Sequence, residues 1–242
     1  MQLRLERRFN DGLLFNVSYV FAKTIDDISG ISTGTTIQVP NYQDYYNRRS
    51  NKSVSTFDVR HRVIGNFTWQ VPFGYNGKYL KDGVVGQIIG GWGLSAIVQA
   101  QGGLPLFLQV VNNGLGGLAF NGAAIRPNVI GDPIIASESD KKNTLTWFNT
   151  AAFQSPTTYQ FGNAPRTFSN LRGPGFFGTN MSLQRNFKIT ETTRLQFRAE
   201  AFNIFNRANF IIPVGVLGAA NFGKLLAAED ARQMQFALKL YF

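Results

Sequence analysis

A strict alternation of apolar and polar residues recurs along this chain and limits the folds that it can adopt. Around residues 13–22, for example, Phe15, Val17 and Tyr19 alternate with Asn16 and Ser18. Successive side chains of a β-strand point to opposite faces of the sheet, so each such segment is predicted to be a strand with one apolar and one polar face. The segments predicted as strands are residues 2–9, 13–22, 57–69, 91–101, 177–187, 194–206 and 233–242.

The lengths of the strands and of their connections indicate a membrane-spanning sheet. Several strands have ten or more residues, which is longer than the usual five or six of soluble proteins and matches the roughly nine to eleven residues that cross a bilayer when tilted. Short connections at residues 10–12 and 188–193 alternate with long ones at 23–56, 102–176 and 207–232. Short turns on one side and long loops on the other are typical of outer-membrane barrels. The predicted fold is therefore all-β, an antiparallel up-and-down transmembrane β-barrel segment.

The direction of the strands predicts that this barrel is incomplete. With the short turns in the periplasm, every long loop lies outside and the last strand runs inward. Single-chain bacterial barrels have an even number of strands, at least eight, whereas we expect about seven to nine here. Residues 1–8 also lack the continuous apolar stretch of a secretory signal. We therefore expect residues 1–242 to be the C-terminal part of a longer barrel. The alternative is a soluble, secreted β-sandwich that binds carbohydrate.

Composition excludes several classes of function. The chain has no Cys and one His, which rules out a disulfide scaffold, a Cys-ligated zinc site and a His-rich metal site. Its net charge is +10, but Lys and Arg form no run of five, so a nucleic-acid partner is not expected. With outer-membrane lipid and lipopolysaccharide as the expected partners, the basic balance fits either attraction to anionic lipopolysaccharide or interfacial anchoring, and the sequence does not decide between them. No catalytic constellation and no cofactor-binding motif occurs, so neither an enzymatic activity nor a cofactor is expected.

Six short sequence motifs point to one family. They are FDVRHR at residues 57–62, WQVPFG at 69–74, WFNTAAF at 147–153, LRGPGF at 171–176, LQFRAEAFNIFN at 195–206 and RQMQFALKLYF at 232–242. In combination they resemble the late barrel of TonB-dependent receptors, most closely the Oar-like type with a carboxypeptidase-regulatory-like N-terminal domain that is common in acidobacteria. The loops at 23–56 and 102–146 contribute least to this resemblance.

The resemblance implies a wall segment of an outer-membrane transporter that takes part in substrate uptake in a Gram-negative bacterium. Members of the family carry an N-terminal signal, a plug domain and a TonB box, and this chain contains none of them. TonB would therefore act only through the missing N-terminal part, and the imported substrate cannot be identified from these residues. The family's barrels resemble the 22-stranded transporters, so this chain would supply about a third of the wall.

The C-terminal strand is the strongest candidate functional element. Its apolar positions alternate up to the last residue and are Met234, Phe236, Leu238, Leu240 and Phe242. A terminal Phe after such an alternation resembles the signal that the barrel-assembly machinery reads, and an unpaired strand edge offers free N–H and C=O groups to a partner strand. The alternative is the ordinary sheet edge of a soluble domain.

Charged and aromatic residues give three further expectations. Charges on the polar faces are predicted to point into a wet lumen, and they are Arg60, Arg62, Arg198 and Glu200. The first long loop is a candidate outer ligand surface for a sugar or a cation, or else a solvated variable loop, and its residues are Asp26, Asp27, Tyr42, Asp44, Tyr45 and Tyr46. Interfacial aromatic positions are predicted at Tyr19, Trp69, Trp92 and Tyr241. Arg185, on the apolar face near an inner strand end, is expected to reach the headgroups.

Overall fold

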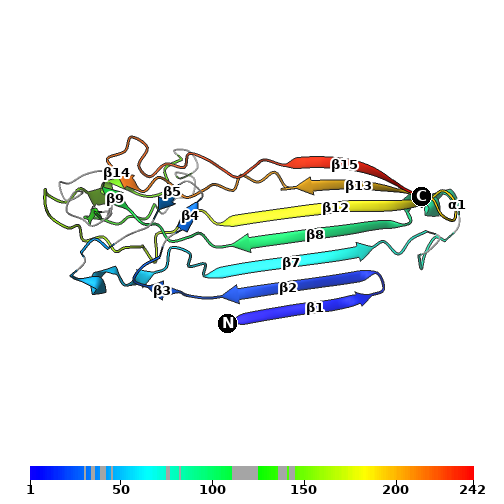
Figure 1. The fold of residues 1–242 in the computed structure, drawn as a ribbon, viewed down its shortest axis with the longest axis horizontal. Helices are drawn as coiled ribbons and strands as arrows, with labels where there is room; N and C mark the ends of the chain where they lie inside the picture. The colour runs from blue at the N-terminus through cyan, green and yellow to red at the C-terminus, as the bar shows by residue number, and fades with distance from the viewer. Residues whose placement is uncertain are drawn as a thin grey trace.

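The computed structural model describes residues 1–29, 31–33, 36–38, 42–44, 46–74, 77–81, 83–110, 125–135, 141 and 145–242, with backbone only at 31–33, 36–38 and 87. Its main element is a seven-stranded antiparallel sheet in the order β1-β2-β7-β8-β12-β13-β15 (Figure 1). The strands are β1 (Gln2–Asn10), β2 (Leu13–Phe21), β7 (His61–Gln70), β8 (Trp92–Gln101), β12 (Phe176–Lys188), β13 (Arg194–Phe202) and β15 (Gln233–Tyr241). Each strand pairs with the long strand that follows it in the chain, which is the predicted up-and-down order.

The register of the sheet confirms that the alternation separates two faces. One row of directly opposed residues crosses from β2 to β15 and is apolar throughout: Phe15, Phe67, Ala96, Met181, Ala201 and Met234. Another row, from β7 to β15 on the opposite face, is polar: Thr68, Ser95, Ser182, Glu200 and Gln235. A slip of one residue in any strand would move its apolar side chains to the other face. Because each row keeps its character from strand to strand, the pairing gives the sheet one apolar face and one polar face.

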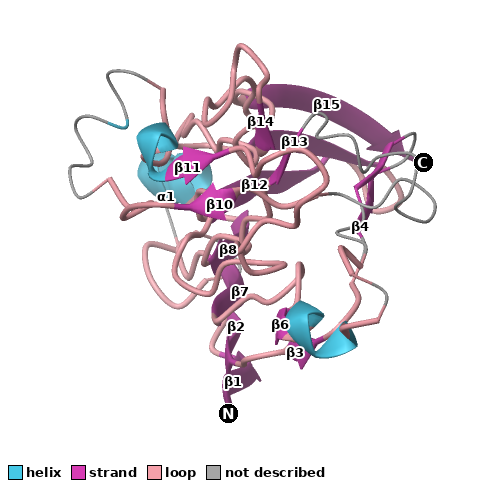
Figure 2. Ribbon diagram, turned by 90° about the vertical axis from the view of Figure 1, so that its left-hand side faces the viewer, coloured by secondary structure: helices cyan, strands magenta, loops and turns pink. Residues whose placement is uncertain are grey.

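The sheet is curved and open. Viewed along the strands, it forms an arc from β1 to β15 (Figure 2). β1 and β15 are its two edges, and they do not pair with each other. The other sheets of the described residues have only two short strands each, β3 (Ile25–Asp26) with β6 (Ser53–Val54), β4 (Ile31–Thr33) with β5 (Thr36–Gln38), β9 (Gln109–Val110) with β14 (Val216–Leu217), and β10 (Asn128–Val129) with β11 (Phe153–Gln154). The second large sheet of a β-sandwich is therefore not found in the described part of the chain.

The connections alternate as predicted. Short turns join β1 to β2 and β12 to β13 at one end of the sheet, where Asp11 and Gly12 adopt positive φ angles of 53° and 79° that a tight hairpin turn requires. The connection from β7 to β8 lies at the same end and contains the helix α1 (Gly83–Ile89), and the C-terminus also lies at this end of the sheet (Figure 1). The three long connections lie together at the opposite end.

Two predicted strands are shorter than expected. β7 begins at His61 and not at residue 57, because Asp58 is buried in the long connections, where it binds an arginine. β13 ends at Phe202 and not at residue 206, because Asn203 and Asn206 take positive φ angles of 49°, which no strand accommodates.

The three long connections fold into a compact unit with its own hydrophobic core. We call the described residues of 22–60, 102–175 and 203–232 the outer cap; it includes the two 3₁₀ turns Arg48–Asn51 and Thr150–Ala152. Its core consists of Leu106, Leu108, Phe148, Ala152, Phe153, Ala164, Phe168 and Leu171. Phe148 is 0% exposed, and its ring meets those of Phe153 and Phe222 edge to face at centroid distances of 5.6 and 5.2 Å. The principal core of this chain thus lies beyond the sheet.

Candidate functional site

The C-terminal strand β15 presents its apolar side chains to the outside of the arc. Exposures are 59% for Met234, 67% for Phe236 and Leu238, 56% for Leu240 and 97% for Phe242. Among the described strands β15 pairs with β13 alone, so its other edge has no partner within this part of the chain. The five predicted residues therefore lie where both a lipid environment and a partner strand can reach them.

The opposite face of the sheet carries paired charges. In β13, Arg198 forms an ion pair with Glu200, and Glu200 also accepts a hydrogen bond from Gln235 of β15. Arg62 lies on the same polar face, opposite Val20 and Gln101. Arg60 differs from the prediction, because it precedes β7 and donates to the carbonyl of Ser169 in the outer cap at 3.2 Å.

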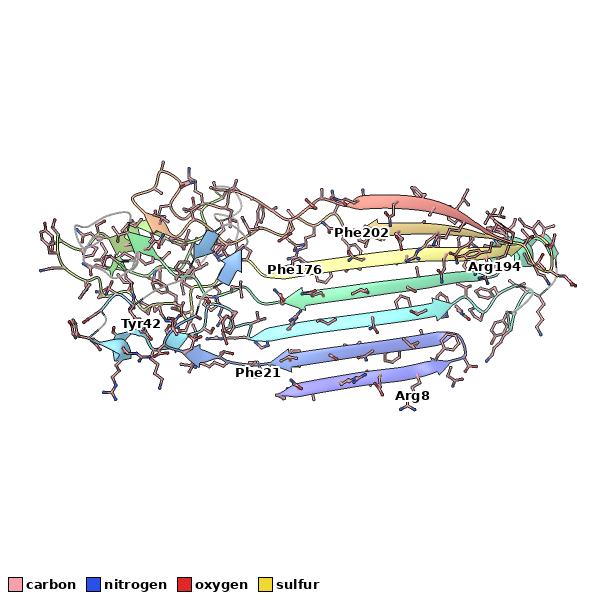
Figure 3. The ribbon with its side chains drawn as sticks, in the orientation of Figure 1. Arg8, Phe21, Tyr42, Phe176, Arg194 and Phe202 are labelled. Carbon is pink, nitrogen blue, oxygen red and sulfur yellow. The ribbon has the colours of Figure 1, made fainter. Side chains whose placement is uncertain are left out.

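Aromatic residues gather near both ends of the apolar face. At the outer end, the Tyr19 hydroxyl lies 2.8 Å from Nδ1 of His61, and Phe21 packs beside the His61 ring. At the other end, Trp92 packs edge to face on Phe197. Figure 3 shows Phe21 at the outer end of its strand. Phe176 and Phe202, also at outer strand ends, and Arg194, at the inner end, lie on the polar face, opposite Gln101, Gln233 and Tyr241.

Tyr241 lies on the polar face and not on the predicted aromatic girdle. It is opposite Arg194, whose guanidinium lies 4.5 Å from the ring centroid, and its hydroxyl donates to Gln196 at 3.4 Å. The Tyr241 ring therefore lies beside a guanidinium and an amide group.

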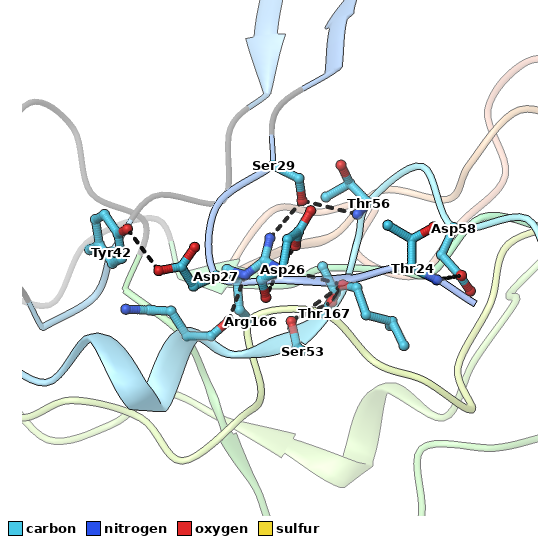
Figure 4. A network of polar contacts seen from close by, with 12 residues as sticks. Thr24, Asp26, Asp27, Ser29, Tyr42, Ser53, Thr56, Asp58, Arg166 and Thr167 are labelled. Carbon is cyan, nitrogen blue, oxygen red and sulfur yellow. Dashed lines mark hydrogen bonds and ion pairs between the residues drawn. The ribbon is translucent and has the colours of Figure 1, made fainter. Parts of the chain in front are cut away.

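A buried arginine organises the candidate ligand loop. Arg166 is 1% exposed and binds the Asp26 carboxylate, the carbonyl of Asn51 at 2.8 Å and the hydroxyl of Ser29 at 2.7 Å (Figure 4). Next to it, Thr167 contacts Ser53 at 2.7 Å. Asp26 is thus engaged in holding the first long connection against the second.

The remaining predicted loop residues do not converge on one point. Asp27 forms an ion pair with Arg48 at 2.9 Å and accepts a hydrogen bond from Tyr42 at 3.4 Å. Asp44 accepts from the backbone N–H of Tyr46 at 2.9 Å, and the Tyr46 side chain is fully exposed. Tyr45 lies outside the described residues. The structure joins Asp27 to Tyr42 and places Asp26 and Asp27 in the wall of one cavity.

An open surface cavity of about 350 Å³ lies beside this cluster. It is lined by Ile25, Asp26, Asp27, Arg48, Arg49 and Lys52. The hydrogen bond from Arg48 lowers the pKa of the Asp27 carboxyl below its usual value, so that Asp27 stays ionised and neutralises one of the three cations. The cavity is therefore better suited to an anionic or polar group than to the cation that the sequence suggested.

Two more arginines of the outer cap were not singled out from the sequence. Arg126 donates its backbone N–H to Gln43 at 2.7 Å, and its guanidinium binds Asn51 and the carbonyl of Ser50 at 3.2 Å. Burial, followed by the nearby charge of Arg166, lowers the pKa of Arg126 to about 10, so it remains protonated at neutral pH.

Arg172 is the second of them. It forms an ion pair with Asp58 and donates to the carbonyl of Gly103 at 3.1 Å.

The sequence held one signal that could have identified Arg126. It is the first charged residue after the uncharged stretch 83–125, and a cation in that position needs buried partners.

A second cavity lies on the polar face, where the sheet meets the outer cap. Its volume is about 340 Å³, and its polar lining includes Gln99, Asn180, Asn203, Glu229, Asp230 and Gln233. The rings of Phe176 and Phe202 form part of the remaining wall. Amides and carboxylates beside aromatic rings suit a polar ligand that enters from the lumen.

Neither a membrane-spanning helix nor a cluster of metal ligands is found among the described residues. None of their helices is long and apolar enough to cross a membrane. Within the same residues, no group of three or more His, Asp or Glu side chains is placed to hold a metal ion.

The sheet is curved, has one apolar and one polar side, and carries short turns at one end and long loops at the other. These features define the wall of a membrane β-barrel. The comparison with protein families agrees: the family model described as "Outer membrane beta barrel domain" matches residues 1–235, and the chain belongs to that family. No curated protein and no solved structure matches it significantly. The protein is accordingly located in the outer membrane of a Gram-negative bacterium.

Proposed function

We propose that this chain is a wall segment of a TonB-dependent receptor and takes part in substrate uptake. The observation that carries the proposal is the open arc of seven strands, whose two edge strands, β1 and β15, do not pair with each other. An open sheet edge is not tolerated in a bilayer, because its N–H and C=O groups would lack partners there. Further strands must close the barrel, and the resemblance of the six sequence motifs favours a large transporter.

The polar face of the sheet supports a water-filled or plugged lumen. Its amide, hydroxyl and charged side chains, such as the Arg198–Glu200 pair, fit the interior of a wide barrel. Large outer-membrane transporters enclose a plugged lumen of this kind. A substrate that passes along this wall would meet the cavity lined by Asn180, Asn203 and Asp230.

The outer cap supports a receptor role. Its own aromatic core and its buried arginines hold the long connections in one arrangement, and a preorganised loop surface loses less entropy when it binds a ligand. The cavity lined by Asp27, Arg48 and Lys52 is one candidate first contact for a substrate.

The partners follow from the same surfaces. Lipid and lipopolysaccharide would cover the apolar face, and the barrel-assembly machinery would recognise β15 through its unpaired edge and its terminal Phe242. TonB would be reached only through an N-terminal part. We expect no enzymatic activity, cofactor or nucleic-acid partner.

Binding of TonB by the full-length protein tests this proposal. We expect the periplasmic domain of TonB to bind the full-length protein, and not a variant that lacks the N-terminal part, when complexes are isolated after chemical cross-linking. Absence of a complex with the full-length protein would contradict the receptor role, although the membership in the outer-membrane barrel family would stand.

The role of β15 has a separate test. Phe242→Ser should reduce the amount of folded, heat-modifiable protein in the outer membrane, while Tyr241→Ser, its neighbour on the polar face, should reduce it much less. Equal yields from both variants would argue against Phe242 as part of an assembly signal.

A further inference from the structure

The short helix α1 has its apolar side facing away from the protein. Val84, Val85 and Ile88 are 71%, 60% and 62% exposed. Its buried positions are glycines: Gly86 lies within the helix and Gly90 directly follows it. This is the reverse of a helix in a soluble protein, where the apolar residues face the core.

Glycines allow the other side of α1 to pack closely against its own connection. A Cβ atom added at Gly74 would lie 2.5 Å from the Cα of Gly90 and 2.7 Å from the carbonyl oxygen of Gly86. A Cβ added at Gly86 would lie 2.1 Å from the carbonyl oxygen of Leu80. The backbone contact fixes which side of α1 is turned outward.

Two side chains attach α1 to the apolar face of the sheet. The carbonyl of Ile88 accepts hydrogen bonds from Nε1 of Trp92 at 3.1 Å and from Nη1 of Arg185 at 2.6 Å. Arg185 is directly opposite both Trp92 and Phe197, and Phe197 is opposite the exposed Leu238. α1 therefore lies at the inner end of the lipid-facing surface (Figure 1). Figure 2 shows it on the convex side of the arc.

We propose that α1 is an interfacial element that inserts Val84, Val85 and Ile88 into the periplasmic leaflet of the outer membrane. The occupant of this surface is phospholipid, because the surface continues the apolar face of an outer-membrane barrel at the end that carries the short turns. Trp and Arg side chains concentrate at such interfaces, where an apolar body and a polar tip are both satisfied. Trp92 and Arg185 thus direct the exposed side of α1 into lipid.

The same geometry explains why the connection from β7 to β8 is longer than the other inner turns. The turn between β12 and β13 carries one exposed apolar residue, Ile189, whereas α1 adds three at the depth of the headgroups. Small apolar helix faces of this kind insert into the boundary between headgroups and acyl chains. The inference uses the barrel family and does not depend on TonB or on a substrate.

The absence of Cys from the chain allows a direct test. The variants Val85→Cys, Ile88→Cys, Thr192→Cys and Leu238→Cys are made in the full-length protein, with any cysteine elsewhere replaced by Ser, and labelled with a nitroxide in phospholipid vesicles. Leu238 is the lipid-facing control, and Thr192, in the exposed turn between β12 and β13, is the aqueous control. Collision rates with oxygen and with a water-soluble nickel chelate are then compared by electron paramagnetic resonance.

We expect the labels at 85 and 88 to collide more often with oxygen than with the nickel chelate, as at position 238 and opposite to position 192. Collision rates at 85 and 88 that resemble those at 192 would place α1 in water and overturn the proposal. Low rates with both reagents would show that a protein surface covers α1, and this result would overturn it as well. Two labelled positions protect the test against local misfolding at one of them.

Discussion

Arg166 and Asp26 are 140 residues apart in the chain, and yet the buried guanidinium of Arg166 binds the Asp26 carboxylate within the outer cap. The contact joins the first long connection to the second. Ser29 and the carbonyls of Asn51, Asp26 and Val54 accept further hydrogen bonds from the guanidinium, so each of its three nitrogens has a partner although the side chain has almost no access to water. The outer loops of this barrel segment thus behave as one folded unit.

Replacement of Arg166 by Met should therefore loosen the outer cap without unfolding the sheet. The variant leaves the Asp26 carboxylate without its ion-pair partner in a mostly buried position, and breaking a buried pair in this way typically costs about 3–5 kcal/mol. We expect faster cleavage by an added protease within residues 22–60 and 145–175 of the folded protein, followed by mass spectrometry of the fragments.

Two further variants make this test specific. Arg166→Met combined with Asp26→Asn removes the uncompensated charge and should restore part of the resistance. Arg48→Met breaks the exposed pair with Asp27 and should change little, because exposed ion pairs contribute little to stability. Equal sensitivity in all three variants would contradict the central position of Arg166.

The two faces of the sheet predict opposite results for the same substitution at adjacent positions. Val17, in the middle of β2, lies on the apolar face, and Asn16 lies on the polar face opposite Glu6. Val17→Lys should destabilise the protein by about 2–4 kcal/mol, the cost of Lys at the bilayer midplane. Asn16→Lys should stay within about 0.5 kcal/mol of the parent, as surface substitutions usually do. Urea unfolding in phospholipid vesicles, followed by tryptophan fluorescence, measures both, and the reverse order would mean that the faces are assigned incorrectly.

The sequence predicted the sheet well because its signal is local. Period-two patterning in residues 13–21 or 233–241 assigns each side chain to a face without knowledge of the neighbouring strand, and the alternation of loop lengths predicts the common order of the strands. The predicted start of β7 and the predicted end of β13 were less accurate, because the prediction included Asp58 and Asn203 in these strands. The alternation continues through Asp58, but a distant arginine recruits its carboxylate. At Asn203 the alternation is already broken, since Phe202 and Ile204 occupy the polar parity, and the side chain of Asn203 binds the backbone of residues 207 and 230.

The outer cap could not be predicted in the same way. The partners of Arg126, Arg166 and Arg172 lie 69 to 140 residues away or are backbone carbonyls, which carry no sequence signature. For the same reason the candidate ligand loop was interpreted as a free surface, although Asp26 and Asp27 already have cationic partners. The polar cavity beside Asn180 was missed because its residues come from four separate segments.

The exposed pair of Asp27 and Arg48 predicts how the cap responds to acid. Because the hydrogen bond from Arg48 lowers the pKa of Asp27 below 3.8, the folded state binds this proton less readily than the unfolded state. The contribution of the pair to stability is thus fully present above the unfolded pKa and is lost as the pH falls through the lower folded value. The difference in thermal midpoint between the parent and Asp27→Asn should be constant from pH 5 to 8 and shrink below about pH 4. A difference that instead disappears near pH 6 would point to another titrating group.

A last prediction concerns the junction between the sheet and the outer cap. The side-chain amide of Asn209 accepts a hydrogen bond from the N–H of Phe177 at 3.0 Å and donates one to its carbonyl at 2.9 Å, so it replaces the strand partner that β13 no longer supplies there. Asn209 is 4% exposed, and Asn209→Ala would leave two buried backbone groups unpaired, at about 1–3 kcal/mol each. Asn209→Asp should also destabilise, because a carboxylate cannot donate to the Phe177 carbonyl. The matched control is Asn186→Ala, which removes an exposed hydrogen bond with Gln196 and should unfold in urea at nearly the parent midpoint. A similar shift of the urea midpoint in all three variants would show that the amide of Asn209 has no special role.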